Sequence, residues 1–182
     1  MKYYYLFLSV LFFATLVSCS SSKRNYTYHG PKKKISRENQ IRQLSQPYDI
    51  RNEVVVRSLK HVGRPYRYGG KTPQSGFDCS GFISYIFSEA GVPLSGSSHE
   101  QATLGIKKDY EQLQAGDLIF FGSKDKISHV SMVLKNESGE MEVIHSTTSS
   151  GVRIDNVSKS SYWKGKFLFG RDILYPLEWA SK

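Results

Sequence analysis

The sequence predicts an α+β protein, in which helices in the first half of a domain are followed by strands in the second half. Apolar residues recur at helical spacing over residues 51–62 and 79–90. Apolar and polar residues instead alternate over residues 128–134 and 141–145, as they do in half-buried strands, and Asn-Glu-Ser-Gly at residues 136–139 is a turn signal between them. Helices and strands that are segregated along the chain favour an α+β fold.

One domain of ordinary size and a tail account for the 182 residues. Most of the formal charge of +9 lies outside the predicted domain: residues 19–47 carry seven Lys or Arg and one Glu, whereas residues 48–182 carry 17 basic and 15 acidic residues. We therefore expect a flexible basic tether over residues 19–47, a domain over residues 48–182, and no nucleic-acid partner. The charge of the tether would also suit an anionic lipid surface.

Residues 1–18 have the features of a secretory signal peptide. Lys2 precedes an apolar run over residues 3–17, which is shorter than the roughly 20 residues that a membrane-spanning helix needs. The run ends in Leu16-Val17-Ser18-Cys19, which resembles the lipobox of bacterial lipoproteins, where the peptide is cut before the cysteine and a lipid is attached to it. An ordinary signal peptide with a chance cysteine is the alternative.

Lipidation of Cys19 would anchor the mature protein to a membrane through acyl chains such as palmitate. Ser20 resembles the residue that follows the lipidated cysteine in outer-membrane lipoproteins. We therefore expect a protein of the cell envelope, held at the outer membrane and facing the periplasm. A lipidated Cys19 cannot pair with Cys79, the other cysteine of the sequence. Cys79 would then be a lone thiol in an exported protein, which calls for a chemical reason.

Cys79 is predicted to lie in the first turn of the helix over residues 79–90. Asp78 is a candidate N-cap for this helix, and Gly91 and Pro93 end it. The positive end of the helix dipole, together with a nearby imidazolium, is expected to lower the thiol pKa from its ordinary value of about 8.5, which favours a nucleophile. The alternative is a small apolar side chain buried under the helix.

Two histidines are predicted to meet across the hairpin of the two alternating segments. Symmetric pairing about residue 137 sets Val133 opposite Met141. The same pairing sets His129 opposite His145, with Cβ atoms about 5 Å apart. Two imidazoles beside a lone thiol form an arrangement that can carry nucleophilic catalysis.

Zinc binding is the alternative chemistry for one cysteine and two histidines, because three protein ligands and an open position make a catalytic zinc site. The sequence has no His-x-x-x-His or Cys-x-x-Cys pair to support it. We therefore expect no metal and no cofactor.

Further elements complete the predicted domain. Ser98 and Gln101 form a capping-box signature for a short helix that ends near Leu104. More strands are predicted over residues 118–121, 151–157 and 167–174. Three aromatic residues near the end of the domain are assigned to the core: Trp163, Phe167 and Phe169.

Five motifs, in the same order, resemble those of the NlpC family of papain-like cysteine peptidases, which are bacterial cell-wall hydrolases. The resemblance covers roughly residues 53–176. The motifs are Gly63-x-Pro-Tyr-Arg-Tyr-Gly-Gly, Gly76-Phe-Asp-Cys-Ser-Gly-Phe, Ala115-Gly-Asp-Leu-Ile-Phe-Phe, Ser128-His-Val-x-Met-Val and Ile144-His-Ser.

The resemblance implies a papain-like NlpC fold, with the nucleophile helix packed on a small antiparallel sheet. It also implies the catalytic roles: Cys79 as the nucleophile, His129 as the general base, and His145 as the third polar residue, which orients His129. The backbone N–H of Cys79, at the start of its helix, is the expected oxyanion donor.

The same resemblance implies the substrate contacts. Tyr66 would line the site, while Asp78 and Ser80 would hold the free amino end of the substrate. Many relatives carry Arg-Thr-Ser after the proline that follows the cysteine helix, whereas this chain has Gly96-Ser97-Ser98 there. The missing arginine bears on substrate preference and leaves the catalytic positions untouched.

The implied activity is hydrolysis of peptidoglycan stem peptides, most often at the bond from γ-D-glutamate to the diamino acid. Two alternatives with the same Cys/His mechanism are an amidase, which cuts between the sugar and L-alanine, and an endopeptidase that cuts the crosslink. A third alternative is a wall-binding lipoprotein without catalysis. We expect a monomer whose partners are stem peptides and, through its lipid, a membrane.

Overall fold

The computed structural model describes residues 49–124 and 126–175. The predicted signal peptide, the tether and Cys19 lie outside the described residues, so the expectations for them remain predictions. Among the helices that are described, none is long and apolar enough to cross a membrane.

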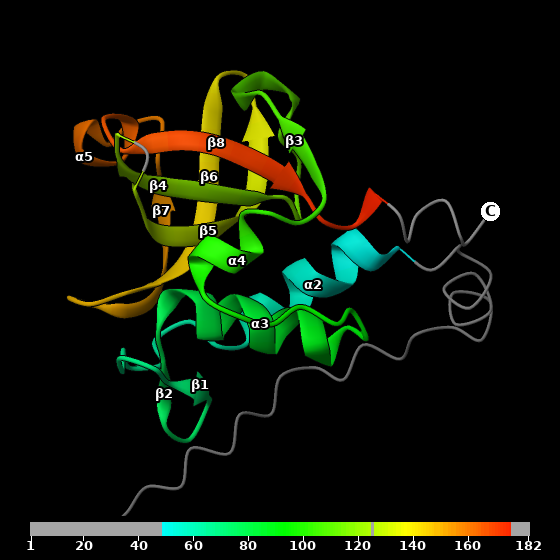
Figure 1. Cartoon of the computed structure of the whole chain (residues 1–182), viewed down its shortest axis with the longest axis vertical. Coiled ribbons are helices and arrows are strands. Elements are labelled where there is room, and N and C mark those ends of the chain that lie inside the picture. Colours follow the sequence, from blue (N-terminus) through cyan, green and yellow to red (C-terminus); the bar gives the residue numbers. More distant parts are fainter. Residues whose placement is uncertain (1–48, 125, 176–182) are drawn as a thin grey trace, which may run out of the picture. The chain divides into compact units, whose positions relative to one another are not determined.

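An antiparallel sheet of six strands, in the order β3-β8-β4-β5-β6-β7, forms the centre of the described part (Figure 1). The strands are β3 (Ile106–Lys108), β4 (Leu118–Ser123), β5 (Lys126–Glu137), β6 (Glu140–Thr147), β7 (Gly151–Asn156) and β8 (Phe167–Asp172). A small hairpin pairs β1 (Lys71–Thr72) with β2 (Gly76–Phe77). The helices are α2 (Ile50–Leu59), α3 (Cys79–Glu89), α4 (Ser98–Gln101) and α5 (Ser161–Lys164), and a 3-10 turn covers Tyr110–Gln112. The predicted α+β fold is confirmed.

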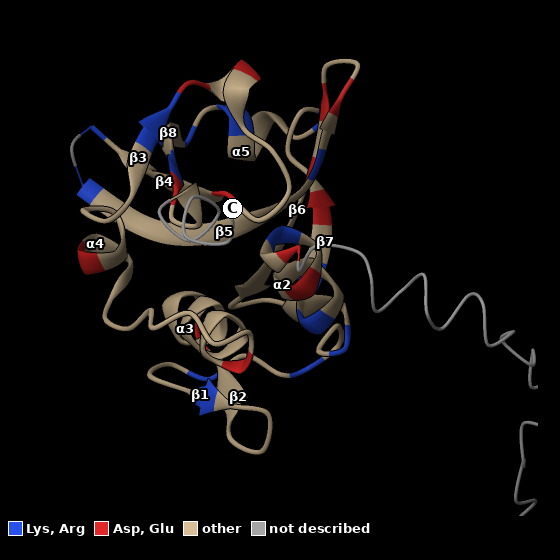
Figure 2. Ribbon diagram, turned by 90° about the vertical axis from the view of Figure 1, so that its right-hand side faces the viewer, with Lys and Arg blue, Asp and Glu red and all other residues tan. Residues whose placement is uncertain are grey.

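The helix α3 packs on β5 and β6 and supplies the main core on one face of the sheet. Figure 2 shows α2 and α3 together on one side of the strands, with acidic and basic residues mixed along the ribbon. Four side chains of α3 at helical spacing are fully buried: Phe82, Ile83, Ile86 and Phe87. Burying side chains of this size stabilises a fold by about 1.5–3 kcal/mol each, which fixes the helix that begins at Cys79.

A second apolar cluster covers the other face of the central strands. It contains Ile119 and Phe121 of β4, Val133 of β5, and Met141 and Val143 of β6. Because both faces of these strands are covered, residues 130–133 are all buried instead of alternating between core and solvent.

The helix α2 differs from its prediction. It ends at Leu59, and its buried residues are Ile50, Val54 and Ser58, four residues apart. Leu59 and Val62 were expected on the apolar face but are 44% and 50% exposed. Asp49 caps the helix by accepting hydrogen bonds from the first-turn backbone N–H groups.

The short helix α4 begins with a different cap from the predicted one. Ser97 is the N-cap, and Glu100 completes the capping box, one residue earlier than the Ser98 and Gln101 pair. Gln101 is instead fully buried and donates through Nε2 to the Ser80 carbonyl and the Ser84 hydroxyl. It therefore ties α4 to the first turns of α3.

The predicted register of the histidine hairpin is wrong by two residues. Val133 pairs with Val143 and not with Met141. The turn consists of Ser138 and Gly139, both with positive φ, and a β-bulge follows between Val133 and Lys135. A shift of two residues returns every side chain to the same face of the sheet, so the two histidines still share a face.

Candidate active site

Cys79 is held at the first turn of α3 by the residues on either side of it. The Asp78 carboxylate caps the helix by accepting from Gly81 N at 2.6 Å, and it accepts from Gly69 N at 2.9 Å. The Gly70 carbonyl accepts from Asp78 N at 3.0 Å, and a Cβ on Gly81 would collide with that carbonyl. The loop before the motif and the helix after it therefore approach so closely that only glycine fits at residue 81.

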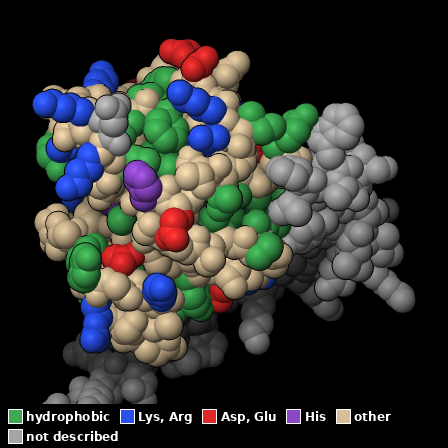
Figure 3. All heavy atoms as spheres, viewed as in Figure 1, with side chains coloured by type: hydrophobic (Ala, Val, Ile, Leu, Met, Phe, Trp, Pro, Cys, Tyr) green, Lys and Arg blue, Asp and Glu red, His purple; other side chains and the backbone are tan. Residues whose placement is uncertain are grey.

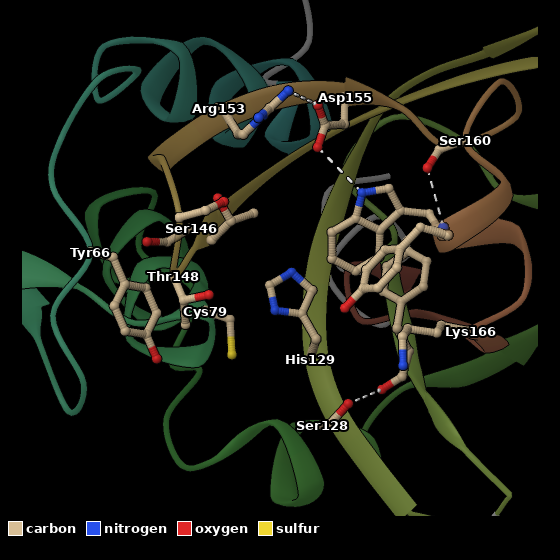
Figure 4. A pocket seen from close by; sticks show the side chains of 15 residues that line it. Tyr66, Cys79, Ser128, His129, Ser146, Thr148, Arg153, Asp155, Ser160 and Lys166 are labelled. Carbon is tan, nitrogen blue, oxygen red and sulfur yellow. Dashed lines mark hydrogen bonds and ion pairs between the residues drawn. The ribbon is translucent and has the colours of Figure 1, made fainter.

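The two imidazoles are joined by a hydrogen bond of 3.0 Å between His129 Nε2 and His145 Nδ1. His145 is fully buried, and its other nitrogen, Nε2, lies 3.0 Å from Asp155 Oδ2. His129 projects from β5 into the cleft, and its Nδ1 lies on the side of Cys79 (Figure 4). A chain of hydrogen bonds thus runs from Asp155 through both histidines toward the thiol.

This chain fixes the proton on each ring. A carboxylate can only accept, so His145 Nε2–H donates to Asp155. Burial lowers the pKa of His145, which keeps the ring neutral and leaves a lone pair on its Nδ1. His129 must therefore donate through Nε2–H, and its Nδ1 is the lone pair that faces the thiol.

The pKa shifts of both groups favour a neutral thiol and a neutral imidazole in the free enzyme, contrary to the lowered thiol pKa expected from the sequence. Burial raises the pKa of the Cys79 thiol; the backbone N–H of Val130 opposes this shift, and the nearby Asp78 carboxylate adds to it. Burial and the neighbouring His145 ring lower the pKa of His129 to about 3. Desolvation outweighs the helix dipole here, so the thiol proton must be removed during the reaction.

Trp163 packs against the second apolar cluster, as its sequence context predicted, and it also lines the cleft, which the sequence did not predict. Its ring stacks on His129 with centroids 5.1 Å apart and an interplanar angle of 27°. Its indole N–H donates to Asp155 Oδ2 at 3.3 Å. Trp163 therefore covers the His129 ring and helps to hold the carboxylate that orients His145.

The cleft around these groups has a volume of about 470 Å³. In Figure 4, Tyr66 and Thr148 lie on the Cys79 side, and Lys166 lies beyond His129. Burial raises the pKa of the Tyr66 phenol, with Cys79 as the next contributor, so this ring is close to the thiol.

Asp78 and Ser80 are not among the residues that line the cleft. The Ser80 hydroxyl donates to Asp78 Oδ1 at 3.2 Å, so both side chains have local partners. With the bonds from Gly69 and Gly81, three of the roughly four acceptor positions of the Asp78 carboxylate are occupied. The place of the missing arginine, Gly96, has a φ of 96°, and its carbonyl accepts from Gln101 Nε2 at 3.3 Å.

The described residues contain no group of three His, Cys, Asp or Glu side chains that could hold a metal ion. The structure places Cys79 and His129 on one cleft and bonds His145 to His129, and sequence reasoning did not identify Asp155 or Trp163 as site residues. Asp155 comes close to His145 because β7 pairs with β6 so that Arg153 faces His145, and Asp155, two residues further on, shares that face; this pairing is not visible in the sequence.

Comparison with known proteins agrees with this geometry. The family model described as the NlpC/P60 family matches residues 63–171, which include Cys79, His129 and His145. A gamma-DL-glutamyl hydrolase of Bacillus subtilis is 39% identical over 126 residues, which are 69% of this chain and 30% of the relative. The E. coli murein DD-endopeptidase MepS/murein LD-carboxypeptidase is 29% identical over 168 residues, which are 87% of this chain and 86% of the relative.

The structure also matches solved structures of this kind. A crystal structure of an NlpC/P60 family protein from Bacillus cereus superposes with a TM-score of 0.63 and 30% identity, over 70% of this chain and 41% of that one. The chain thus spans less than half of the Bacillus proteins but most of the E. coli one. With the fold, the sequence motifs and the family model in agreement, the chain belongs to the NlpC/P60 family.

Proposed function

We propose that this protein is a cysteine endopeptidase that hydrolyses peptidoglycan stem peptides between γ-D-glutamate and the diamino acid. The observation that carries the proposal is the hydrogen-bonded chain from Asp155 through His145 to His129, which ends at a nitrogen lone pair facing Cys79. The specific bond is supported by the name of the Bacillus subtilis relative, a gamma-DL-glutamyl hydrolase.

In the proposed reaction, His129 Nδ1 takes the thiol proton while Cys79 Sγ attacks the amide carbonyl. The oxyanion is placed near the backbone N–H of Cys79, which has no partner within the helix because it lies in the first turn. His129 then gives its proton to the leaving amine, and a thioester remains on Cys79. Water, deprotonated by His129, hydrolyses the thioester and restores the free thiol.

The Tyr66 side of the cleft would receive the acyl part of the substrate, with Asp78 and Ser80 near its free amino end. The Asp78 carboxylate keeps acceptor capacity for an ammonium in addition to its role as helix cap. A charge-assisted hydrogen bond of this kind contributes about 1.5–3 kcal/mol, enough for a tenfold or larger preference for a free amino end.

Cleavage of the crosslink is a second candidate. The similarity to the E. coli protein, named a DD-endopeptidase and LD-carboxypeptidase, extends over most of both chains. Such an enzyme would use Cys79 and His129 in the same roles on a different bond.

Mass spectrometry of muropeptides before and after incubation with the purified protein separates these candidates. Release of L-Ala-D-Glu from tripeptide or tetrapeptide stems supports the proposal. Loss of crosslinked dimers makes the protein a crosslink endopeptidase, and separation of the sugar from L-alanine makes it an amidase. If the purified protein releases no product, the remaining candidate is a wall-binding protein without catalysis.

The roles of the thiol and the imidazoles are tested by substitution. Cys79→Ala and His129→Ala should each lower turnover by at least about 10³-fold, and His145→Ala should lower it less, because His145 acts through His129. Iodoacetamide should inactivate the enzyme and a chelator should not. Inhibition by the chelator, with a thiol that resists alkylation, would favour the zinc alternative.

We also propose that the mature protein begins at a lipidated Cys19 and is held at the outer membrane. The support is the short apolar run that ends in Leu16-Val17-Ser18-Cys19. Fatty-acid labelling and membrane fractionation of Cys19→Ala test this. Unchanged labelling in the variant would remove the basis for the anchor.

A further inference from the structure

Beyond the catalytic imidazole, the cleft carries a positive charge, Lys166, that no carboxylate of the described residues compensates. Lys166 lines the cleft on the far side of His129 from Cys79 (Figure 4). Its Nζ lies 5.1 Å from the centroid of the Tyr162 ring, which holds the side chain by a cation–π contact. Within residues 49–124 and 126–175, no ion pair joins Lys166 to a carboxylate.

Among the described residues, Asp155 is the only acidic residue that lines the cleft, and it has other partners. Asp155 binds Arg153 through Oδ1 and binds His145 and Trp163 through Oδ2. Its charge is therefore matched by Arg153, and no carboxylate of the described residues forms an ion pair with Lys166. Figure 3 shows Lys and Arg side chains gathered on the side of the molecule where α5 lies, which adds to the positive potential there.

The mechanism assigns this end of the cleft to the leaving group. His129 must deliver its proton to the leaving amine, so the leaving residue lies beside His129 and not behind Cys79. Tyr162 contacts Lys166, Trp163 contacts Tyr162, and Phe121 contacts Trp163, so these three lining rings form the walls at this end. Aromatic walls fit the methylene groups of a diamino acid, and a cation at their edge fits a carboxylate.

We propose that Lys166, held by the Tyr162 ring, is a subsite for a free carboxylate on the residue that leaves from the scissile bond. This inference rests on the proposed function and adds a substrate requirement to it. Two carboxylates of the leaving diamino acid have the required chemistry: the one at the end of its side chain and its own α-carboxylate when it is the last residue of the stem. A lysine in this position offers no side-chain carboxylate, so only its α-carboxylate could bind Lys166.

Four synthetic tripeptides of the form L-Ala-γ-D-Glu-X test the proposal. X is either meso-diaminopimelate or lysine, each with its α-carboxyl group free or amidated, so the two carboxylates vary independently. The enzymes are the intact chain and its Lys166→Gln, Lys166→Arg and Lys164→Gln variants. Lys164 is exposed on α5 and does not line the cleft, which makes it the matched control.

Lys166→Gln should lower kcat/KM about tenfold on the tripeptides that carry the recognised carboxylate and leave the amidated lysine tripeptide unchanged. Lys166→Arg should restore most of the loss, and Lys164→Gln should change nothing. If the loss follows meso-diaminopimelate, Lys166 binds the side-chain carboxylate. If the loss follows the free α-carboxyl group, Lys166 binds the α-carboxylate. An equal loss on all four tripeptides, or no loss on any of them, overturns the subsite.

Binding to Cys79→Ala separates this inference from the proposed function. Calorimetry with the same uncleaved tripeptides should show about tenfold weaker binding of the recognised tripeptide when Lys166→Gln is added to Cys79→Ala. If the intact enzyme cleaves none of the tripeptides but this difference in binding remains, the cleavage assignment fails and the subsite stands. Equal binding with and without Lys166 overturns the subsite whatever the enzyme cuts.

Discussion

At the scale of single residues, Asp155 determines which nitrogen of His129 is available as a base. Its carboxylate can accept a hydrogen bond but cannot donate one, so His145 donates to it through Nε2–H. His145 Nδ1 then accepts from His129 Nε2–H, which leaves the lone pair of His129 on Nδ1. Among the described residues, Asp155 bonds to His145 and not to Cys79 or His129, so it is a positioning residue. Its carboxylate is in turn held by Arg153 and Trp163.

Asp155→Asn should lower kcat by about 10–100-fold with little change in KM, because an amide N–H facing His145 reverses the tautomer of both rings. Nitrogen-15 NMR of the His145 ring gives a readout that a merely structural role would not alter. The proton should move from Nε2 in the native protein to Nδ1 in the variant. A native tautomer combined with full activity would contradict the role of Asp155.

The raised pKa of Cys79 predicts the pH dependence of its alkylation. The thiolate is the reactive form, and a raised pKa means that it accumulates only at higher pH than for an ordinary cysteine. The rate constant for iodoacetamide should therefore be low at pH 7 and should still be rising at about pH 9. A plateau that begins below pH 7 would indicate a thiolate and imidazolium pair in the free enzyme.

At the scale of elements, the position of the nucleophile depends on a close contact between α3 and the loop before it. The Gly70 carbonyl lies against residue 81, and the Asp78 side chain bonds to both the loop and the helix. The thiol is therefore placed by backbone contacts on both sides of its own motif. The packing of α3 on the sheet then fixes the distance to β5.

Gly81→Ala should destabilise the protein by about 1–3 kcal/mol and lower activity, because the new Cβ collides with a backbone carbonyl that cannot move aside. Gly165→Ala is the control: Gly165 has no positive φ, and the nearest atom to a Cβ there lies 3.4 Å away. It should leave the free energy of unfolding unchanged or raise it by up to about 1 kcal/mol. Urea unfolding measures both, and equal effects would contradict the close contact at Gly81.

The helix α3 was predictable from sequence because its apolar spacing, cap and terminating glycine all agree. The hairpin was predictable only in outline. A bulge and a turn at Ser138 and Gly139 set its register, and a local pattern of alternation does not encode a bulge. Trp163 was assigned to the core alone, since the sequence does not distinguish an aromatic residue in a core from one that also covers a catalytic ring. The contact between Asp155 and His145 depends on the pairing of two separate strands.

At the scale of the whole molecule, Arg51 connects the first described helix to the sheet. Its guanidinium binds Asp117 beside β4 and Asp172 at the end of β8, both at 2.7 Å. The two carboxylates are 0% and 2% exposed, and Lys108 of β3 binds both of them. Asp117, the buried aspartate of the Ala115-Gly-Asp motif, is therefore a structural residue that holds the start of the domain.

Arg51→Met should destabilise the protein by about 3 kcal/mol, since it leaves two buried carboxylates with one cation between them. Arg57→Met, which breaks a partly exposed pair with Glu53 on the same helix, should cost less than about 1 kcal/mol. Thermal or urea unfolding compares the two. The kcat of folded Arg51→Met should stay close to that of the intact enzyme, because Arg51 does not line the catalytic cleft.

The neutral resting state of Cys79 has a consequence for how long the enzyme survives. Peroxides and disulfides react with thiolates and scarcely with protonated thiols. A cysteine that stays protonated until an amide carbonyl is in place, half-covered at the base of its cleft, is therefore slow to become a sulfenic acid or a mixed disulfide. Because burial raises the pKa of the thiol, His129 must deprotonate Cys79 in each catalytic cycle. The same burial protects the protonated thiol from oxidants between cycles.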